Sequence, residues 1–317
     1  MSFSIGRLEK NSAYLMADLV ELIVSLKLDG RAEFQLDDIA SIIEGQPDFD
    51  DRDINNLRDS LSGAWGQLEY RSARFNTDYP FRLVRNGLRL KTTFTAGARI
   101  YLLLLACSRL RSFDRELRNA WATTFAFLSR EALRELMPAS AAVKIFDANS
   151  EDRKSYFGTD LRKALKVLGR DLAAAMINEA ECDLKDASGD AGIDLVAIAK
   201  WNDNATGIHA ILGQCAAREK EWPEKRFEAS PLGLRGLYSF LTDPVNAVFI
   251  PVLYREANGS WVAQTPASGC LLVDRLRILL LLNQRSTQTQ IVRKPWFRKF
   301  ELGFYTVRKS SMLPAVA

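Results

Sequence analysis

Apolar positions follow two different periods along the chain, one helical and one alternating. Over long stretches they recur every three or four residues, which is typical of amphipathic helices. This period predicts helices over residues 12–28, 34–45, 51–75, 96–109, 112–137, 160–180 and 271–283, the second beginning with a short extended piece. Residues 192–201 and 208–216 alternate instead and flank the turn residues NDNATG, which predicts a β-hairpin.

The first 92 residues end in a second predicted hairpin, which is basic. Asn86 and Gly87 separate FRLVR from LRLK, and an Asn-Gly pair between such runs is typical of a type I′ turn. Three helices followed by a basic hairpin predict a winged helix-turn-helix, whose third helix enters the major groove of DNA. The wing would contact phosphates through Arg82, Arg85, Arg89 and Lys91. The alternative is a three-helix bundle used for self-association, because the third helix is not strongly basic at its start.

Pro138 and the small residues after it mark a boundary near residues 138–142. We therefore divide the chain into a winged-helix-like domain for DNA binding or self-association (1–92), a helical connector (93–140) and an α/β domain (141–317). In the last of these, AVFIPVLY at 247–254 predicts a buried strand, and Pro251 indicates a place near the sheet edge. The fold class expected for the whole chain is α/β, or more narrowly α+β, with a helical N-terminal region.

Composition excludes several kinds of site. The 317 residues carry a formal net charge of +4, which is compatible with nucleic acid as a partner. His209 is the one histidine, so a multi-histidine metal site is excluded. The four cysteines lie far apart and form no CxxC pair, which argues against a zinc ribbon or a disulfide framework. With no secretory signal pattern and only short apolar runs, we expect a cytoplasmic protein without a membrane partner.

The predicted hairpin also gathers oxygen atoms at one end. Folding residues 192–216 about their turn brings Asp194 opposite the segment from Gln214 to Ala216. Carboxylate and amide oxygens at the rim of an apolar sheet suit Mg²⁺ or Mn²⁺. The alternative is two ordinary strands with an aspartate at a turn.

GDAGIDLVA and the later ILGQCA resemble the core of the PD-(D/E)xK nuclease superfamily, in its Mrr-like restriction endonuclease branch. Gly189, Gly192 and Asp194 match the first submotif, and Gln214 and Cys215 match the second. The resemblance covers roughly residues 146–284. It implies a restriction-endonuclease-like mixed sheet in residues 141–317. It also implies a metal ion held by Asp194, Gln214 and the main-chain carbonyl of Cys215.

The chain departs from this family at one position, where Ala216 stands in place of the lysine that orients or activates the attacking water. We expect Lys220 to compensate, because a turn of the chain after the strand can bring its side chain back. The alternative is that the metal alone lowers the pKa of its bound water. In this fold class a helix ahead of the hairpin often supplies a further acid. Glu179 is the candidate, unless it merely ends its helix in solvent.

Two functions follow from the resemblance. The first is a Mg²⁺- or Mn²⁺-dependent DNA endonuclease of a prokaryotic restriction or anti-phage defence system, with Asp194, Gln214, Lys220 and Glu179 as its catalytic residues. The alternative is an inactive nuclease-fold subunit that binds DNA or acts as a scaffold. The expected partners are DNA, a second protein of the defence system and further copies of this chain.

Overall fold

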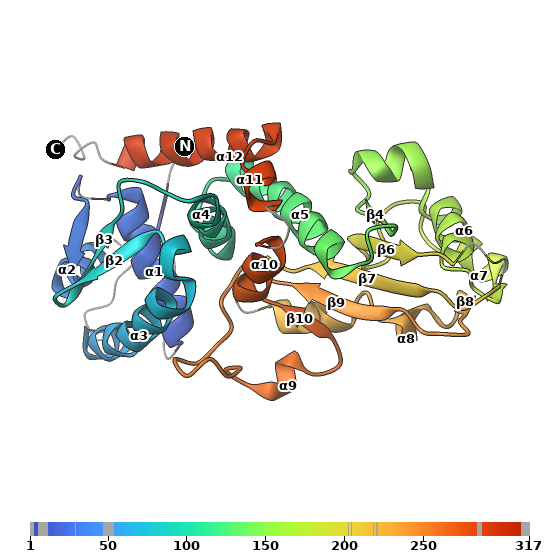
Figure 1. The fold of residues 1–317 in the computed structure, drawn as a ribbon, viewed down its shortest axis with the longest axis horizontal. Coiled ribbons are helices and arrows are strands. Elements are labelled where there is room, and N and C mark those ends of the chain that lie inside the picture. The colour runs from blue at the N-terminus through green and yellow to red at the C-terminus, as the bar shows by residue number, and fades with distance from the viewer. Residues whose placement is uncertain are drawn as a thin grey trace.

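The protein is a mixed α/β structure, described here from a computed structural model (Figure 1). The structure describes residues 3–5, 12–28, 30–46, 54–201, 203, 205–217, 219, 221–283 and 287–311. In Figure 1 the N-terminal elements lie at the left and a five-stranded sheet at the right, with α4, α5 and α10 between them. None of the described helices combines the length and the apolar character needed to cross a membrane.

The N-terminal part contains three helices and a small sheet. Its elements are α1 (Ala13–Leu26), β1 (Glu33–Gln35), α2 (Leu36–Glu44), α3 (Ile54–Phe75), a 3₁₀ turn (Asn76–Asp78), β2 (Phe81–Val84) and β3 (Gly87–Leu90). The three strands are antiparallel in the order β1-β3-β2. The predicted helices and the basic hairpin are therefore confirmed as elements.

The turn of this hairpin differs from the prediction by one residue. Val84 pairs with Gly87, so the two-residue loop is Arg85–Asn86, and Asn86 carries the positive φ of 57°. Gly87 lies in β3 beside the third strand, where an added Cβ would stand 2.3 Å from the carbonyl oxygen of Phe34. A glycine is required here because β1 approaches so closely. The prediction that Gly87 belongs to the turn is therefore wrong.

Two long helices connect this part to the large sheet. They are α4 (Ala96–Ser108) and α5 (Arg115–Leu136), separated by a 3₁₀ turn (Leu110–Ser112). The side chain of Thr95 accepts a hydrogen bond from the amide of Ala98, and that of Asp114 accepts one from Leu117. These caps fix where each helix begins, and both helices agree with the helical period of the sequence.

The large sheet consists of β4 (Ala142–Ile145), β6 (Leu195–Ala199), β7 (His209–Cys215), β9 (Val245–Phe249) and β10 (Leu271–Val273), in the order β10-β9-β7-β6-β4. Neighbours in β4-β6-β7 are antiparallel, whereas β7, β9 and β10 are parallel. Leu195 pairs with Gly213, which confirms the predicted hairpin. A separate two-stranded sheet joins β5 (Met176–Ile177) to β8 (Tyr238–Ser239).

Alternating side chains of the hairpin pack on opposite faces of this sheet. Leu195, Ala197 and Ile211 belong to the apolar cluster that includes α5, while Val196 and Leu212 belong to the cluster built on α6 (Leu161–Asp171). The remaining elements are a π-helix (Arg153–Phe157), α7 (Glu179–Asp183), a 3₁₀ helix η5 (Trp222–Phe227), α8 (Pro231–Leu234), α9 (Gln264–Ala267), α10 (Arg275–Leu282), α11 (Thr287–Ile291) and α12 (Pro295–Ser311). The sheet is thus covered on both faces.

Three predictions for the second half of the chain are wrong. The helix expected over 160–180 ends at Asp171, because Ala173 adopts a positive φ of 47° and the chain continues into β5. The helix expected over 271–283 is split into β10 and α10, and the Asp274 side chain caps α10. Pro251 does not mark an edge, because it follows the end of β9, which lies between β7 and β10.

One apolar cluster extends across both expected domain boundaries, from α1 through α4 and α5 to the large sheet. At its centre lies a set of fully buried charges that we call the central ion cluster: Asp18, Glu21, Arg71 and Arg275. Asp18 accepts hydrogen bonds from Arg71 at 2.8 Å and from Arg275 at 2.9 Å. The hydroxyls of Tyr79 and Tyr101 donate to Glu21. Residues from α1, α3 and α10 are therefore held together by the same charges.

Candidate metal centre

Asp194 stands where three strands meet at the end of the large sheet. Its main-chain amide donates to the carbonyl of Gly213 on β7 at 2.9 Å, and its carbonyl accepts from the amide of Phe146, directly after β4, at 2.7 Å. Its carboxylate oxygen Oδ2 accepts a hydrogen bond of 2.7 Å from the amide of Cys215. Both neighbouring strands thus fix the backbone of Asp194, and β7 orients its side chain.

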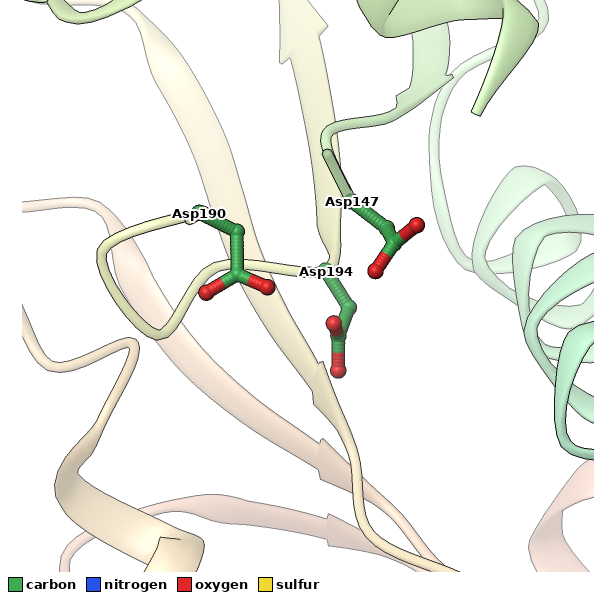
Figure 2. A group of neighbouring side chains, drawn as sticks. All are labelled: Asp147, Asp190 and Asp194. Atoms are coloured by element: carbon green, nitrogen blue, oxygen red, sulfur yellow. The ribbon is translucent and has the colours of Figure 1, made fainter. Parts of the chain in front are cut away.

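Two further aspartates point toward Asp194 (Figure 2). Asp147 comes from the loop after β4 and Asp190 from the glycine-rich turn before β6, and one carboxylate oxygen of each lies within 4.8 Å of the others. We call these three residues the aspartate cluster. Among the residues that the structure describes, no other histidine, cysteine, aspartate and glutamate side chains converge as closely.

The glycine-rich turn is shaped to present Asp190. Gly189, Ala191 and Gly192 all have positive φ angles, a run that L side chains rarely adopt. A Cβ added to Gly192 would lie 2.8 Å from the Cβ of Glu228, so the turn is pressed against the end of η5. The Oδ1 atom of Asp190 accepts a hydrogen bond from the Gly192 amide at 2.9 Å, which orients the carboxylate.

Burial and like charge shift the titration of this site. The pKa of Asp194 is raised to about 7, chiefly by desolvation and also by the nearby carboxylates of Asp190 and Asp147, while the Cys215 amide and Lys225 oppose the shift. Desolvation likewise raises the pKa of the Cys215 thiol well above its usual range, so the sulfur stays protonated. The possible ligand atoms are therefore carboxylate oxygens whose negative charges are poorly compensated by nearby cations. Such a set of oxygens fits Mg²⁺ or Mn²⁺.

The aspartate cluster opens into a cleft of about 790 Å³. One wall is the exposed side of α5 at Asn119, Thr123 and Phe127, and the opposite wall is the loop at 149–151. Asp147, Asp194 and Cys215 lie on its surface. A substrate can therefore reach the cluster from solvent. We refer to this space as the metal cleft.

Of the expected catalytic residues, the structure places Gln214 beside Asp194 and Glu179 away from it. Gln214 lies one residue beyond the pair Leu195–Gly213, which puts it opposite Asp194. It is 4% exposed, and its side-chain oxygen has no hydrogen-bond partner. Glu179 begins α7 with a side chain that is 61% exposed and an ion pair to Lys166 at 3.3 Å. Glu179 therefore does not continue the apolar stripe of α6 toward the sheet, and its side chain lies in solvent. The acids beside Asp194 are Asp147 and Asp190.

Lys220 lies outside the described residues, so its expected role stays a prediction. Lys225 on η5 is a described lysine whose charge acts on Asp194. Its amine lies 3.2 Å from a carboxylate oxygen of Glu228, the residue packed against Gly192. Lys200, at the other end of the hairpin, is paired with Asp171 at 3.0 Å.

The wing presents its cations on one side of the hairpin. Arg82 and Arg89 are directly opposed in the register of β2 and β3, and both are exposed. Glu33 on β1 forms an ion pair with Arg89. Burial and the charge of Arg82 lower the pKa of Lys91. Glu33 offsets one of the two opposed charges, and Arg82 is the exposed cation of this face that could contact an anion.

Two residues of the aspartate cluster were missed in the sequence. Asp190 belongs to the same GDAGID motif as Gly189 and Asp194, so this motif could have identified it. Asp147 follows a strand of four residues and reaches the cluster only because β4 pairs with β6. Comparisons with protein-family models, with curated proteins and with solved structures find no match for this chain. A function for the metal cleft therefore depends on its own residues and on the resemblance of the hairpin motifs.

Proposed function

We propose that the protein is a metal-dependent DNA endonuclease of a prokaryotic restriction or anti-phage defence system, acting in the cytoplasm. One observation carries the proposal: Asp194 meets the main chain of Cys215 at the end of the hairpin, together with Asp147 and Asp190. This is the place at which the resemblance to the PD-(D/E)xK superfamily implies a metal ion.

The residues of the cleft have distinct roles in this proposal. Asp194, Asp147 and Asp190 would hold the ion through carboxylate oxygens, and the Cys215 amide keeps the Asp194 carboxylate in place. A divalent ion bound there would lower the pKa of a water molecule and polarise the phosphate. Lys225 adds positive charge near the cluster, where the negative charge of a phosphate increases during hydrolysis.

The N-terminal part would supply DNA binding. Its order of elements, α1-β1-α2-α3-β2-β3 with β1 paired to β3, is the order expected of a winged helix. Arg82, exposed on its wing, supports contact with phosphates, whereas Arg89 is paired with Glu33.

The test is cleavage of plasmid and linear DNA by the purified full chain in Mg²⁺, in Mn²⁺ and in EDTA. We expect cleavage in either metal and none in EDTA, and we expect Asp194→Asn to abolish it. Asp243→Asn is the matched control, because Asp243 is an exposed carboxylate paired with Arg235. Cleavage in EDTA, or equal cleavage by Asp194→Asn, would contradict the proposal.

One observation favours the alternative of an inactive subunit that binds DNA or acts as a scaffold. Ala216, at the position of the family's lysine, is 1% exposed and packs with Trp222 and Val248 in an apolar cluster. A lysine placed there would put its amine among apolar side chains, so Ala216→Lys is not a simple restoration. DNA binding by a wild-type chain that cleaves nothing in either metal would select this alternative.

A further inference from the structure

A second groove lies on α5 next to the metal cleft. It has a volume of about 500 Å³ and runs between α5 and α12. Thr123 and Phe127 line both spaces, so the groove and the cleft adjoin at the same helical ridge. We call it the aromatic groove, because Trp121, Phe127, Trp296 and Phe300 form much of its wall.

Two half-buried aromatic rings lie at the junction of the two spaces. The rings of Phe127 and Trp296 lie 5.8 Å apart at an interplanar angle of 42°, and both side chains are half-buried. The guanidinium of Arg130 stands 5.7 Å from the centre of the Phe127 ring. Lys299, exposed on α12, borders the groove. Glu116 borders the groove as well, and Arg130 is paired with Glu131 and Asp152, so Lys299 is the cation beside these rings. Aromatic rings next to a lysine are a feature on which unpaired bases stack.

We propose that the aromatic groove binds unpaired bases of single-stranded DNA, while the phosphates that follow them enter the metal cleft. This inference rests on the proposed function and narrows its substrate to DNA with a single-stranded segment. Bases inside a duplex are already covered by their neighbours, so the exposed part of Trp296 can stack on a base only after that base leaves the helix. A DNA strand would have a short route from the aromatic groove to the metal cleft, because Thr123 lines both spaces.

An amphipathic helix from a second copy or a partner protein is the competing occupant of an apolar groove. Continuity with the metal cleft favours DNA, since the groove shares Thr123 and Phe127 with the cleft whose surface carries Asp147 and Asp194. The carboxylates of the cleft repel phosphates, so strand binding should depend on a divalent ion that neutralises them.

The experiment measures binding of the full chain to a labelled single strand and to a blunt duplex of the same sequence. Fluorescence anisotropy in Ca²⁺ gives the affinity without requiring cleavage, and EDTA gives the metal dependence. Trp296→Leu removes the flat ring but keeps apolar packing, and Trp296→Phe keeps a ring. The matched control is Trp201→Leu, because Trp201 is 73% exposed on the loop after β6.

We expect wild type to prefer the single strand in Ca²⁺ and to lose that preference in EDTA. Trp296→Leu should weaken single-strand binding by about 5- to 150-fold, the effect of one lost base–aromatic stack. Duplex binding should stay unchanged, and Trp296→Phe and Trp201→Leu should remain close to wild type. Equal single-strand affinity for Trp296→Leu and wild type overturns the inference. So does a Trp296→Leu variant that changes only self-association in sedimentation.

The two proposals fail separately. A chain that binds single strands through Trp296 but cleaves no DNA supports the groove and contradicts the nuclease. A chain that cleaves DNA equally well with and without the Trp296 ring supports the nuclease and overturns the groove.

Discussion

Replacing Asp194 by asparagine should stabilise the metal-free protein at pH 8, although it removes a proposed metal ligand. The pKa of Asp194 is raised from 3.8 to about 7, chiefly by desolvation and then by Asp190 and Asp147. Between these two values the folded protein binds more protons than the unfolded chain, so stability falls as pH rises. The difference of about 3 in pKa corresponds to about 4 kcal/mol, fully lost above pH 7.

Asparagine carries no charge at any of these pH values, and its side-chain oxygen can still accept the hydrogen bond from the Cys215 amide. We therefore expect Asp194→Asn to exceed wild type in unfolding free energy by about 2–4 kcal/mol at pH 8 in EDTA, because the amide retains part of the desolvation cost. Near pH 4 the two proteins should differ little. Mg²⁺ at about 100 times its Kd should reduce this difference at pH 8 by about 2.7 kcal/mol, because the ion stabilises wild type by that amount.

Urea denaturation at pH 4, 6 and 8, with EDTA and with Mg²⁺, measures these differences. Asp243→Asn serves as the control and should change the unfolding free energy by no more than about 0.5 kcal/mol, because its carboxylate is exposed. If Asp194→Asn is less stable than wild type at pH 8 in EDTA, or if the difference does not vary with pH, the pKa of Asp194 is not raised by burial in the cleft and the reasoning fails.

Three further variants test other parts of the structure. Lys225→Met should slow DNA cleavage without weakening Mn²⁺ binding in calorimetry, because its positive charge near the aspartate cluster repels a cation but favours a phosphate, and weaker Mn²⁺ binding would contradict this role. Arg82→Ala should lower the slope of log affinity for duplex DNA against log salt by about 0.9, one phosphate contact, whereas an equal slope would leave the wing free of DNA. Arg275→Met should lower the unfolding free energy by about 3–5 kcal/mol in urea, because Asp18 then loses a buried partner, and a neutral result would mean that Arg71 alone suffices.

Local patterns predicted the elements whose contacts are local. The hairpin at 192–216 follows from alternation and a turn sequence, and the helices α4 and α5 follow from an apolar period between clear caps. Partners far away in the sequence decided the rest. Gly87 is explained only by the strand β1 lying beside it. Leu271–Val273 is a strand because β9 offers it a parallel edge, although its residues also suit a helix.

The candidate site shows the same division. Asp194 and Cys215 belong to one hairpin, so their proximity could be predicted from spacing. Asp147 joins them through the pairing of Ile145 with Leu195, and no sequence pattern gives the register of two strands that are about fifty residues apart. Glu179 was assigned by extending a helical stripe past Asp171, where the chain in fact leaves the helix.

The central ion cluster has a consequence for the proposed nuclease. Arg71 and Arg275 share the carboxylate of Asp18, and none of the three is exposed, so α3 and the start of α10 cannot move apart without separating buried charges. α3 packs against the wing strand β2, and β10, directly before α10, belongs to the large sheet. In a nuclease built this way the wing and the aspartate cluster would keep a fixed spacing, and cleavage would fall at a constant distance from the DNA contact of the wing.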